Sequence, residues 1–135
     1  MNYVLHARSN YFRVRDAKRF ERWCRYFGLD FWTGKEIPNS EDIAYAIASD
    51  DGQGWPSAHP ETEQDYDFDA ELAKHLDPRD VALLYQVGNE GLRHISGHAS
   101  AIHADGRAVH VGLHTIQDLA RKEFGEQVTI TEACY

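Results

Sequence analysis

Carboxylates occupy every second position of one short acidic stretch, "ETEQDYDFDAE" at positions 61–71: Glu61, Glu63, Asp65, Asp67, Asp69 and Glu71. An extended chain advances about 3.3 Å per residue, so alternate carboxylates would lie roughly 6.6 Å apart. That spacing resembles the separation of neighbouring phosphates along a nucleic-acid strand, which basic grooves recognise. The stretch is therefore a candidate mimic of nucleic-acid charge. The alternative is a solvated acidic loop whose last member, Asp69, caps a helix.

The same stretch partly matches a calcium-binding loop, in which carboxylates at positions 1, 3 and 5 coordinate the ion. Asp65, Asp67 and Asp69 fill these places. The motif then requires a glycine at position 6 and a bidentate glutamate at position 12, where this chain has Ala70 and Leu76. Only a weak, irregular calcium site would remain, so the sequence predicts no bound metal and no cofactor.

Histidines gather near the end of the chain and raise the question of a metal site: His94, His98, His103, His110 and His114. Their segment predicts a hairpin around "ADG", with Gly106 left-handed and His103 paired with Arg107. In that register Ser100 faces His110. One face is apolar and carries Ile95, Ala99, Ala101, Val109, Val111 and Leu113. The other carries His94, Ser96, His98, Ser100, His110 and His114.

This polar face is poorly arranged for one metal ion. His94 and His98 lie about 13 Å apart along a strand, whereas zinc needs both imidazoles at about 2.0–2.1 Å. Only diagonal pairs, such as His98 with His110 or with His114, come within reach of each other. The face is better explained as open to solvent or to a partner.

Catalytic motifs are absent from the sequence. It contains no nucleophile elbow, glycine-rich phosphate loop, H-E-x-x-H or C-x-x-C pattern. Cys24 and Cys134 are too few for a disulfide framework, and Cys24 is expected in the core. We therefore expect a protein without catalytic residues, leaving open an acid–base pair that only the fold would assemble.

Hydrophobic periodicity predicts the elements that must position these residues. Strands are expected at 9–16, 29–32, 42–49, 81–87, on both sides of "ADG" between 92 and 114, and at 127–131. Helices are expected from the cap Asp16 to Gly28, from Asp69 to about 76, and from Thr115 to Gly125. Residues 50–68 read as a long loop that Trp55 anchors by packing. This order predicts one α+β domain over residues 1–135, with two or three helices on one face of a mostly antiparallel sheet.

Charge is segregated along the 135 residues. Positions 1–35 hold eight basic and three acidic residues, positions 36–73 hold eleven acidic and no basic ones, and positions 74–135 hold six basic and eight acidic ones. The acidic region would repel nucleic acid and attract a basic partner. No apolar run approaches the roughly 20 residues that span a bilayer, and the start lacks a signal peptide's apolar core. We expect a cytoplasmic protein that does not bind membranes.

Three segments carry a resemblance to known proteins: "SNYFRVRDAKRFERW", "GWPS" and "DVALLYQVGNEGLRHISGHASAIHADGRAV". Together they resemble small uncharacterised proteins carried by bacterial phages and plasmids. That setting includes anti-CRISPR and anti-restriction inhibitors, which are commonly small, acidic and non-enzymatic. The resemblance implies no catalytic residue, cofactor or defined partner.

Charge and resemblance together favour one hypothesis. The chain would be a non-enzymatic inhibitor from a mobile genetic element that binds a bacterial defence nucleoprotein complex. Its acidic stretch would face a basic surface that normally holds nucleic acid. Two alternatives remain: a small metal-binding protein or enzyme that uses the histidines, and an immunity or accessory protein for a toxin.

Overall fold

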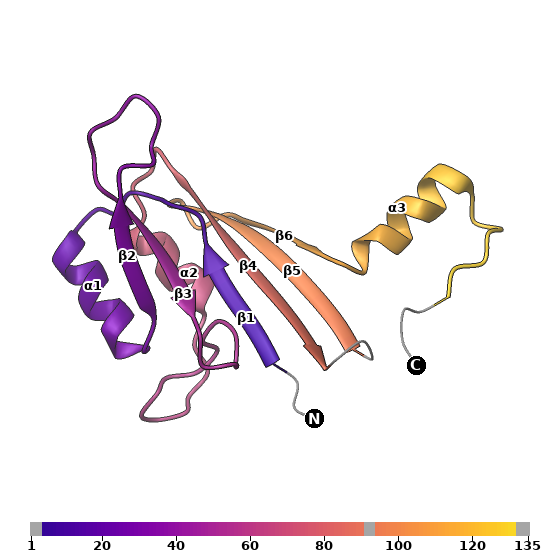
Figure 1. Cartoon of the computed structure of the whole chain (residues 1–135), viewed down its shortest axis with the longest axis horizontal. Helices are drawn as coiled ribbons and strands as arrows, with labels where there is room; N and C mark the ends of the chain where they lie inside the picture. The colour runs from indigo at the N-terminus through magenta and orange to yellow at the C-terminus, as the bar shows by residue number, and fades with distance from the viewer. Residues whose placement is uncertain (1–3, 91–93, 132–135) are drawn as a thin grey trace.

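Six antiparallel strands form one sheet in the order β2-β3-β1-β4-β5-β6 (Figure 1). This computed structural model describes residues 4–90 and 94–131. The strands are β1 (Val4–Ser9), β2 (Asp30–Gly34), β3 (Ala44–Ser49), β4 (Val81–Glu90), β5 (His94–His103) and β6 (Ala108–Gly112). The helices are α1 (Ala17–Tyr26), α2 (Phe68–His75) and α3 (Thr115–Phe124). The α+β class and the antiparallel sheet are as the sequence predicts.

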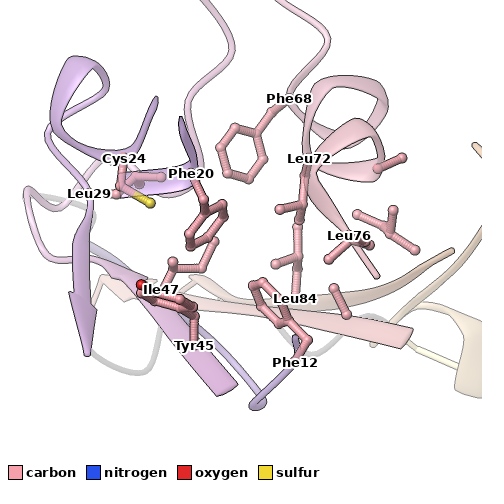
Figure 2. Close-up of a cluster of buried hydrophobic side chains, with 13 residues drawn as sticks. Phe12, Phe20, Cys24, Leu29, Tyr45, Ile47, Phe68, Leu72, Leu76 and Leu84 are labelled. Atoms are coloured by element: carbon pink, nitrogen blue, oxygen red, sulfur yellow. The ribbon is translucent and has the colours of Figure 1, made fainter. Parts of the chain in front are cut away.

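The hydrophobic core lies between one face of the sheet and the helices α1 and α2 (Figures 1 and 2). The Phe20 ring of α1 contacts those of Phe12, which follows β1, and Tyr45 of β3, with centroid distances of 5.8 and 5.1 Å. The buried residues of this core are Phe12, Phe20, Cys24, Leu29, Tyr45, Ile47, Phe68, Leu72, Ala73, Leu76, Ala82, Leu84 and Ile102. Burying large apolar side chains of this kind stabilises the fold by about 1.5–3 kcal/mol each.

Helix α1 forms as its sequence predicts. The Asp16 carboxylate accepts a hydrogen bond from the Arg19 backbone N–H at 3.1 Å, and Phe20 and Cys24 point into the core. Gly28 follows the helix with a φ of 68°, a left-handed conformation that favours glycine. The basic residues Lys18, Arg19, Arg22 and Arg25 lie away from the core.

The strand predicted at 9–16 is wrong, because the regular pairing belongs to Val4–Ser9 and stops there. Asn10 ends it: its side-chain amide donates to the Val81 carbonyl at 3.1 Å and its side-chain oxygen accepts from the Leu83 N–H at 2.8 Å. Phe12 then enters the core, fully buried. Its backbone pairs with that of Tyr45 through an isolated bridge. The alternation of residues 11–15 therefore reflects one deep anchor rather than a continuous strand.

Two further expectations are wrong. The cap of α2 is Asp67, two residues before the expected Asp69, because the Asp67 carboxylate accepts a hydrogen bond from the Ala70 N–H at 3.1 Å. The strand expected at 127–131 does not form within the described chain, where these residues pair with no strand.

The second face of the sheet carries no helix in the described chain. Helices α1 and α2 cover the core face, whereas α3 extends beyond the end of β6, away from both (Figure 1). None of the residues of α3, which are all described, is buried. Among the described residues, no helix has both the length and the apolar character that crossing a bilayer requires.

Candidate functional site

The six alternating carboxylates do not form one extended array. Residues 60–62 are a turn, Glu63 has a φ of 59°, and Asp69 and Glu71 already lie in α2. The extended conformation that would place carboxylates roughly 6.6 Å apart is therefore wrong for this stretch. The structure divides the residues into two groups: Glu61, Glu63 and Asp65 in a loop, and Asp67, Asp69 and Glu71 at the start of α2.

The first group projects from a small hairpin, which we call the acidic loop (residues 58–65). Ala58 bridges Asp65 across its base, the His59 N–H donates to the Gln64 carbonyl at 2.8 Å, and the Glu63 N–H donates to the His59 carbonyl at 3.0 Å. The carboxylates of Glu61, Glu63 and Asp65 are exposed and form no ion pair in the described chain. The acidic loop thus presents three unpaired charges on a hydrogen-bonded backbone.

Aromatic packing holds the acidic loop against α1. The Tyr66 hydroxyl accepts from Trp23 Nε1 at 2.7 Å, and the Tyr66 ring centroid lies 4.4 Å from that of Phe27. The His59 ring lies 4.8 Å from Tyr66. Burial raises the pKa of Tyr66, which keeps its hydroxyl neutral. These contacts give the loop a defined position relative to the core.

The second group of carboxylates has partners at the start of α2. Asp67 caps the helix, and Glu71 pairs with Lys74 at 3.0 Å. Asp69 is half-buried, and burial raises the pKa of its carboxyl, while His110 and His98 act in the opposite direction. The three carboxylates of this group therefore have different roles: Asp67 caps the helix, Glu71 forms an ion pair, and Asp69 is half-buried near two histidines.

Asp69 borders a cleft of about 500 Å³ between the start of α2, the loop at Trp55 and the strands β4, β5 and β6. Aromatic walls come from Trp55, Tyr66 and Phe68. Polar groups come from Asp67, Asp69, Gln86, His98, Ser100 and His110. An apolar wall with a few convergent polar groups is the usual form of a small-ligand site.

The β5–β6 hairpin places the histidines of this cleft as the sequence predicts. His103 N–H donates to the Arg107 carbonyl at 3.0 Å, Gly106 has a φ of 93°, and Ser100 is directly opposite His110. Ser100 Oγ lies 2.7 Å from His110 Nδ1. His98 and His110 thus share the cleft face, opposite Val109 and Val111, which confirms the predicted register.

The other histidines are dispersed. The His114 ring fills the space that a side chain at Gly112 would need, beside the cleft face. His103 Nε2 lies 3.1 Å from the Pro78 carbonyl, at the far end of the hairpin. The side chain of His94 lies outside the described residues. Within the described chain, no three His, Cys, Asp or Glu residues are grouped to hold a metal ion.

Trp55 and Gln86 contribute to the cleft in a way that the sequence does not signal. The Trp55 backbone N–H donates to Gln86 Oε1 at 2.9 Å, and the Trp55 ring stacks on Phe68 at 5.6 Å. This packing confirms Trp55 as an anchor of the long loop. Gly54 precedes it with a φ of 80°, a left-handed conformation that favours glycine, and a Cβ at this position would displace the Gln86 side-chain amide. Among the described side chains, Trp55 Nε1 is buried without a hydrogen-bond acceptor.

The chemistry available in the cleft is limited. Ser100 and His110 form the hydroxyl–imidazole pair on which acyl-transfer sites depend. However, Ser100 is 7% exposed, and no hydrogen bond joins Asp69 to His110 among the described residues. The arrangement is better suited to binding a polar or cationic group between carboxylates and aromatic rings than to nucleophilic attack.

Comparisons with protein-family models, with curated proteins and with solved structures found no match.

Proposed function

We propose that the protein acts by binding another protein, as a non-enzymatic acidic inhibitor of the kind that mobile elements carry. Its contact surface would be the acidic loop, with Glu61, Glu63 and Asp65 facing lysine and arginine side chains of the partner. The observation that supports this proposal is the acidic loop itself, in which unpaired carboxylates stand on a hydrogen-bonded, aromatic-anchored backbone.

The anchoring of the loop favours a binding role over simple solvation. A loop that only keeps a surface in water has no need of a fixed shape. A pre-ordered loop loses little conformational entropy when it docks, so more of the interaction energy appears as affinity. The acidic loop is tied to α1 through Tyr66 and to its own base through the Ala58–Asp65 bridge.

The charge distribution indicates the class of partner. The region 36–73 has eleven acidic residues and no basic ones, so it attracts a strongly basic surface. Bacterial defence effectors that hold nucleic acid in a lysine- and arginine-rich groove present such a surface. We place the encounter in the cytoplasm, and we expect competition with nucleic acid even though the carboxylates do not reproduce phosphate spacing.

A capture experiment tests the proposal. Immobilised protein is incubated with bacterial lysate, and the retained proteins are identified with and without an excess of a nucleic-acid oligonucleotide. We expect retention of a nucleic-acid-binding effector that the oligonucleotide displaces. The variant Glu61→Gln/Glu63→Gln/Asp65→Asn should lose that protein. Retention of a secreted toxin instead would favour the immunity alternative.

A matched control separates local contact from net charge. The variant Glu36→Gln/Glu41→Gln/Glu126→Gln makes the same change in charge at exposed positions outside the acidic loop. It should retain the partner nearly as well as the wild type. Equal loss in both variants would show that only net charge matters, and the acidic loop would not be the contact surface.

The cleft supports a second candidate function, a small-ligand site or enzyme that uses His110. The specific observation is that Asp69, His98, Ser100 and His110 converge on one cavity of about 500 Å³. A serine-directed fluorophosphonate probe tests the enzymatic version. Labelling of the wild type that is lost in both Ser100→Ala and His110→Gln would establish a nucleophilic serine, and absence of labelling would exclude it.

A further inference from the structure

An apolar surface without a partner covers much of the outer sheet face and continues onto α3. Its members are large hydrophobic residues, each between about two-fifths and two-thirds exposed: Val4, Val81, Tyr85, Val87, Ile95, Val109, Val111, Leu113, Ile116, Leu119 and Phe124. The pairing register puts those of β4, β5 and β6 on the face opposite the core. At about half exposure and roughly 200 Å² per large side chain, they leave on the order of 1,000 Å² open. Monomeric proteins rarely expose that much contiguous apolar surface.

We infer that this surface pairs two copies of the chain, with α3 of each copy lying on the open sheet face of the other. The two parts of the surface, α3 and the outer sheet face, complement each other. An amphipathic helix and a sheet with only one face covered by helices each leave an apolar face that must pack against another element. Ile116, Leu119, Ala120 and Phe124 lie within about 140° of the circumference of α3, an arc in which Glu123 is the one charged residue. The open face offers the flat apolar sheet that such a stripe covers.

The junction between β6 and α3 argues against the helix folding back on its own sheet. The Leu113 N–H still donates to the Gly97 carbonyl at 2.9 Å, so the strand pairing continues to the last residue before the turn. The Gly112 N–H donates to Thr115 Oγ1 at 3.1 Å, and the Ile116 N–H donates to the Leu113 carbonyl at 3.2 Å. This bonded junction directs α3 outward (Figure 1). A second chain can meet it there without breaking these bonds.

Size and charge also fit a second copy. A stable interface needs about 800 Å² from each partner, which the open apolar surface provides. The net charge of −8 would oppose self-association elsewhere, but α3 is neutral, with Asp118 and Glu123 balanced by Arg121 and Lys122. The outward positions of β4 from Val81 to Asn89 and of β5 from Ile95 to Ala101 hold no charged residue. An exchange of identical helices also closes as a two-fold dimer and leaves no open binding surface.

Sedimentation of the full-length protein over a range of concentrations tests this inference. We expect a wild-type dimer, with Leu119→Glu weakening dimerisation by at least about tenfold because it places a charge in the interface. Asp118→Asn also changes the charge by one unit, but on the side of α3 opposite Ile116, and should stay within about twofold of the wild type. Val87→Glu, on the sheet face, should match Leu119→Glu. A monomeric wild type at every concentration, or equal effects of Leu119→Glu and Asp118→Asn, would overturn the proposal.

Cross-linking distinguishes the exchanged helix from one that folds back, and it does not depend on variants that weaken the dimer. In a Cys134→Ser background, Leu119→Cys and Val87→Cys are made in separate chains, mixed and treated with a short bismaleimide. We expect a cross-linked species of twice the chain mass. A chain that carries both cysteines is treated in the same way. If that chain cross-links only within itself and the mixture gives no cross-linked dimer, α3 packs on its own sheet and the second copy is excluded.

Discussion

Ser100 of β5 is paired directly opposite His110 of β6, and the Ser100 hydroxyl lies 2.7 Å from His110 Nδ1. Ser100 is nearly buried beneath the cleft, while the His110 ring is exposed at its edge. With Nδ1 engaged by Ser100, the ring is held in one orientation and Nε2 is the nitrogen left for a ligand. The hydrogen bond therefore makes His110 a fixed part of the cleft wall.

Replacing Ser100 tests the strength of this hydrogen bond. Ser100→Ala removes the partner of His110 Nδ1 and should lower the free energy of unfolding by about 1 kcal/mol. Urea denaturation provides the measurement. Ser57→Ala, at an exposed position of the same cleft, is the control and should change stability by no more than about 0.5 kcal/mol. Equal effects at both positions would contradict a specific role for the Ser100–His110 bond.

We predict that the histidines hold no zinc ion. The described residues bring Asp67, Asp69, His98 and His110 to one cleft, but no three of them are grouped as metal ligands. Protein purified without a histidine tag should contain far less than one equivalent of zinc by elemental analysis. A chelator should leave its melting temperature unchanged. One equivalent of zinc that survives dialysis would overturn this prediction.

The two aspartates at the start of α2 should respond to substitution in opposite directions. Asp67→Ala removes the cap of the helix and should cost about 1 kcal/mol. Asp69→Asn should raise stability slightly at pH 7, because burial raises the pKa of this carboxyl and makes its ionised form unfavourable in the folded state. The variant should be more stable than the wild type at pH values above the folded pKa of Asp69. This difference should disappear below the unfolded pKa of about 3.9, where the acid is protonated in both the folded and the unfolded state. Denaturation at pH 7 and in acid would detect both effects.

The Arg13–Asp80 ion pair should govern part of the acid sensitivity of the fold. Arg13 Nη2 lies 2.6 Å from Asp80 Oδ1, Arg13 Nε donates to Oδ2 at 2.8 Å, and both side chains are largely buried. Hydrogen bonds from Arg13 lower the pKa of Asp80, so the pair stabilises the folded state above the unfolded pKa of about 3.9. That stability is lost as the pH falls through the lower folded pKa. Asp80→Asn should reduce the melting temperature at pH 7 by more than about 4 °C, and the difference should narrow in acid.

Asp42 provides the comparison for that pair. It also contacts Arg13, at 3.2 Å, but its side chain is 53% exposed. Solvent screens such a pair, so Asp42→Asn should shift the melting temperature by no more than about 2 °C. Similar decreases in melting temperature for the Asp42 and Asp80 variants would show that the difference in burial does not determine how much each contact contributes to stability.

Cys24 should be chemically inert in the folded protein. Burial raises the pKa of its thiol to about 12, so almost no reactive thiolate is present at pH 8. In a Cys134→Ser background, native protein should react with iodoacetamide far more slowly than protein in urea. Mass spectrometry gives both rates, and equal rates would show that the core around Cys24 opens readily.

Local sequence signals were sufficient for the elements whose boundaries are set by short-range contacts. The cap at Asp16 and the left-handed Gly28 define α1, and the match of apolar faces selects the β5–β6 register. The strand expected at 9–16 fails because Asn10 and Phe12 are held by residues about 70 and 33 positions away along the chain. A single sequence contains no sign of such partners.

The cleft was harder to predict for the same reason. The hairpin register predicts the pairing of Ser100 with His110, but Trp55 and Asp69 come from distant segments, and only the packing of α2 and of the long loop on the sheet brings them to this pair. The alternation at 61–71 suggested one extended contact surface, but a turn at Glu63 and the start of α2 divide it. The glycine at position 54, whose backbone must approach Gln86, was a local signal that could have indicated this loop contact.

The central position of β1 determines when the protein can fold during its synthesis. Val4–Ser9 is synthesised before the other strands of the sheet, yet it pairs with residues 84–89, which are made much later. Until β4 emerges, only β1, β3 and β2 can pair with one another, and the nascent chain cannot complete the middle of its sheet. The pairing of β1 with β4 closes the longest loop between neighbouring strands, and the two halves of the sheet cannot join before it forms. We therefore expect folding on the millisecond-to-second scale typical of sheets with distant pairings. Nascent chains that end before β4 would expose unpaired strand edges, and these are the species that chaperones bind.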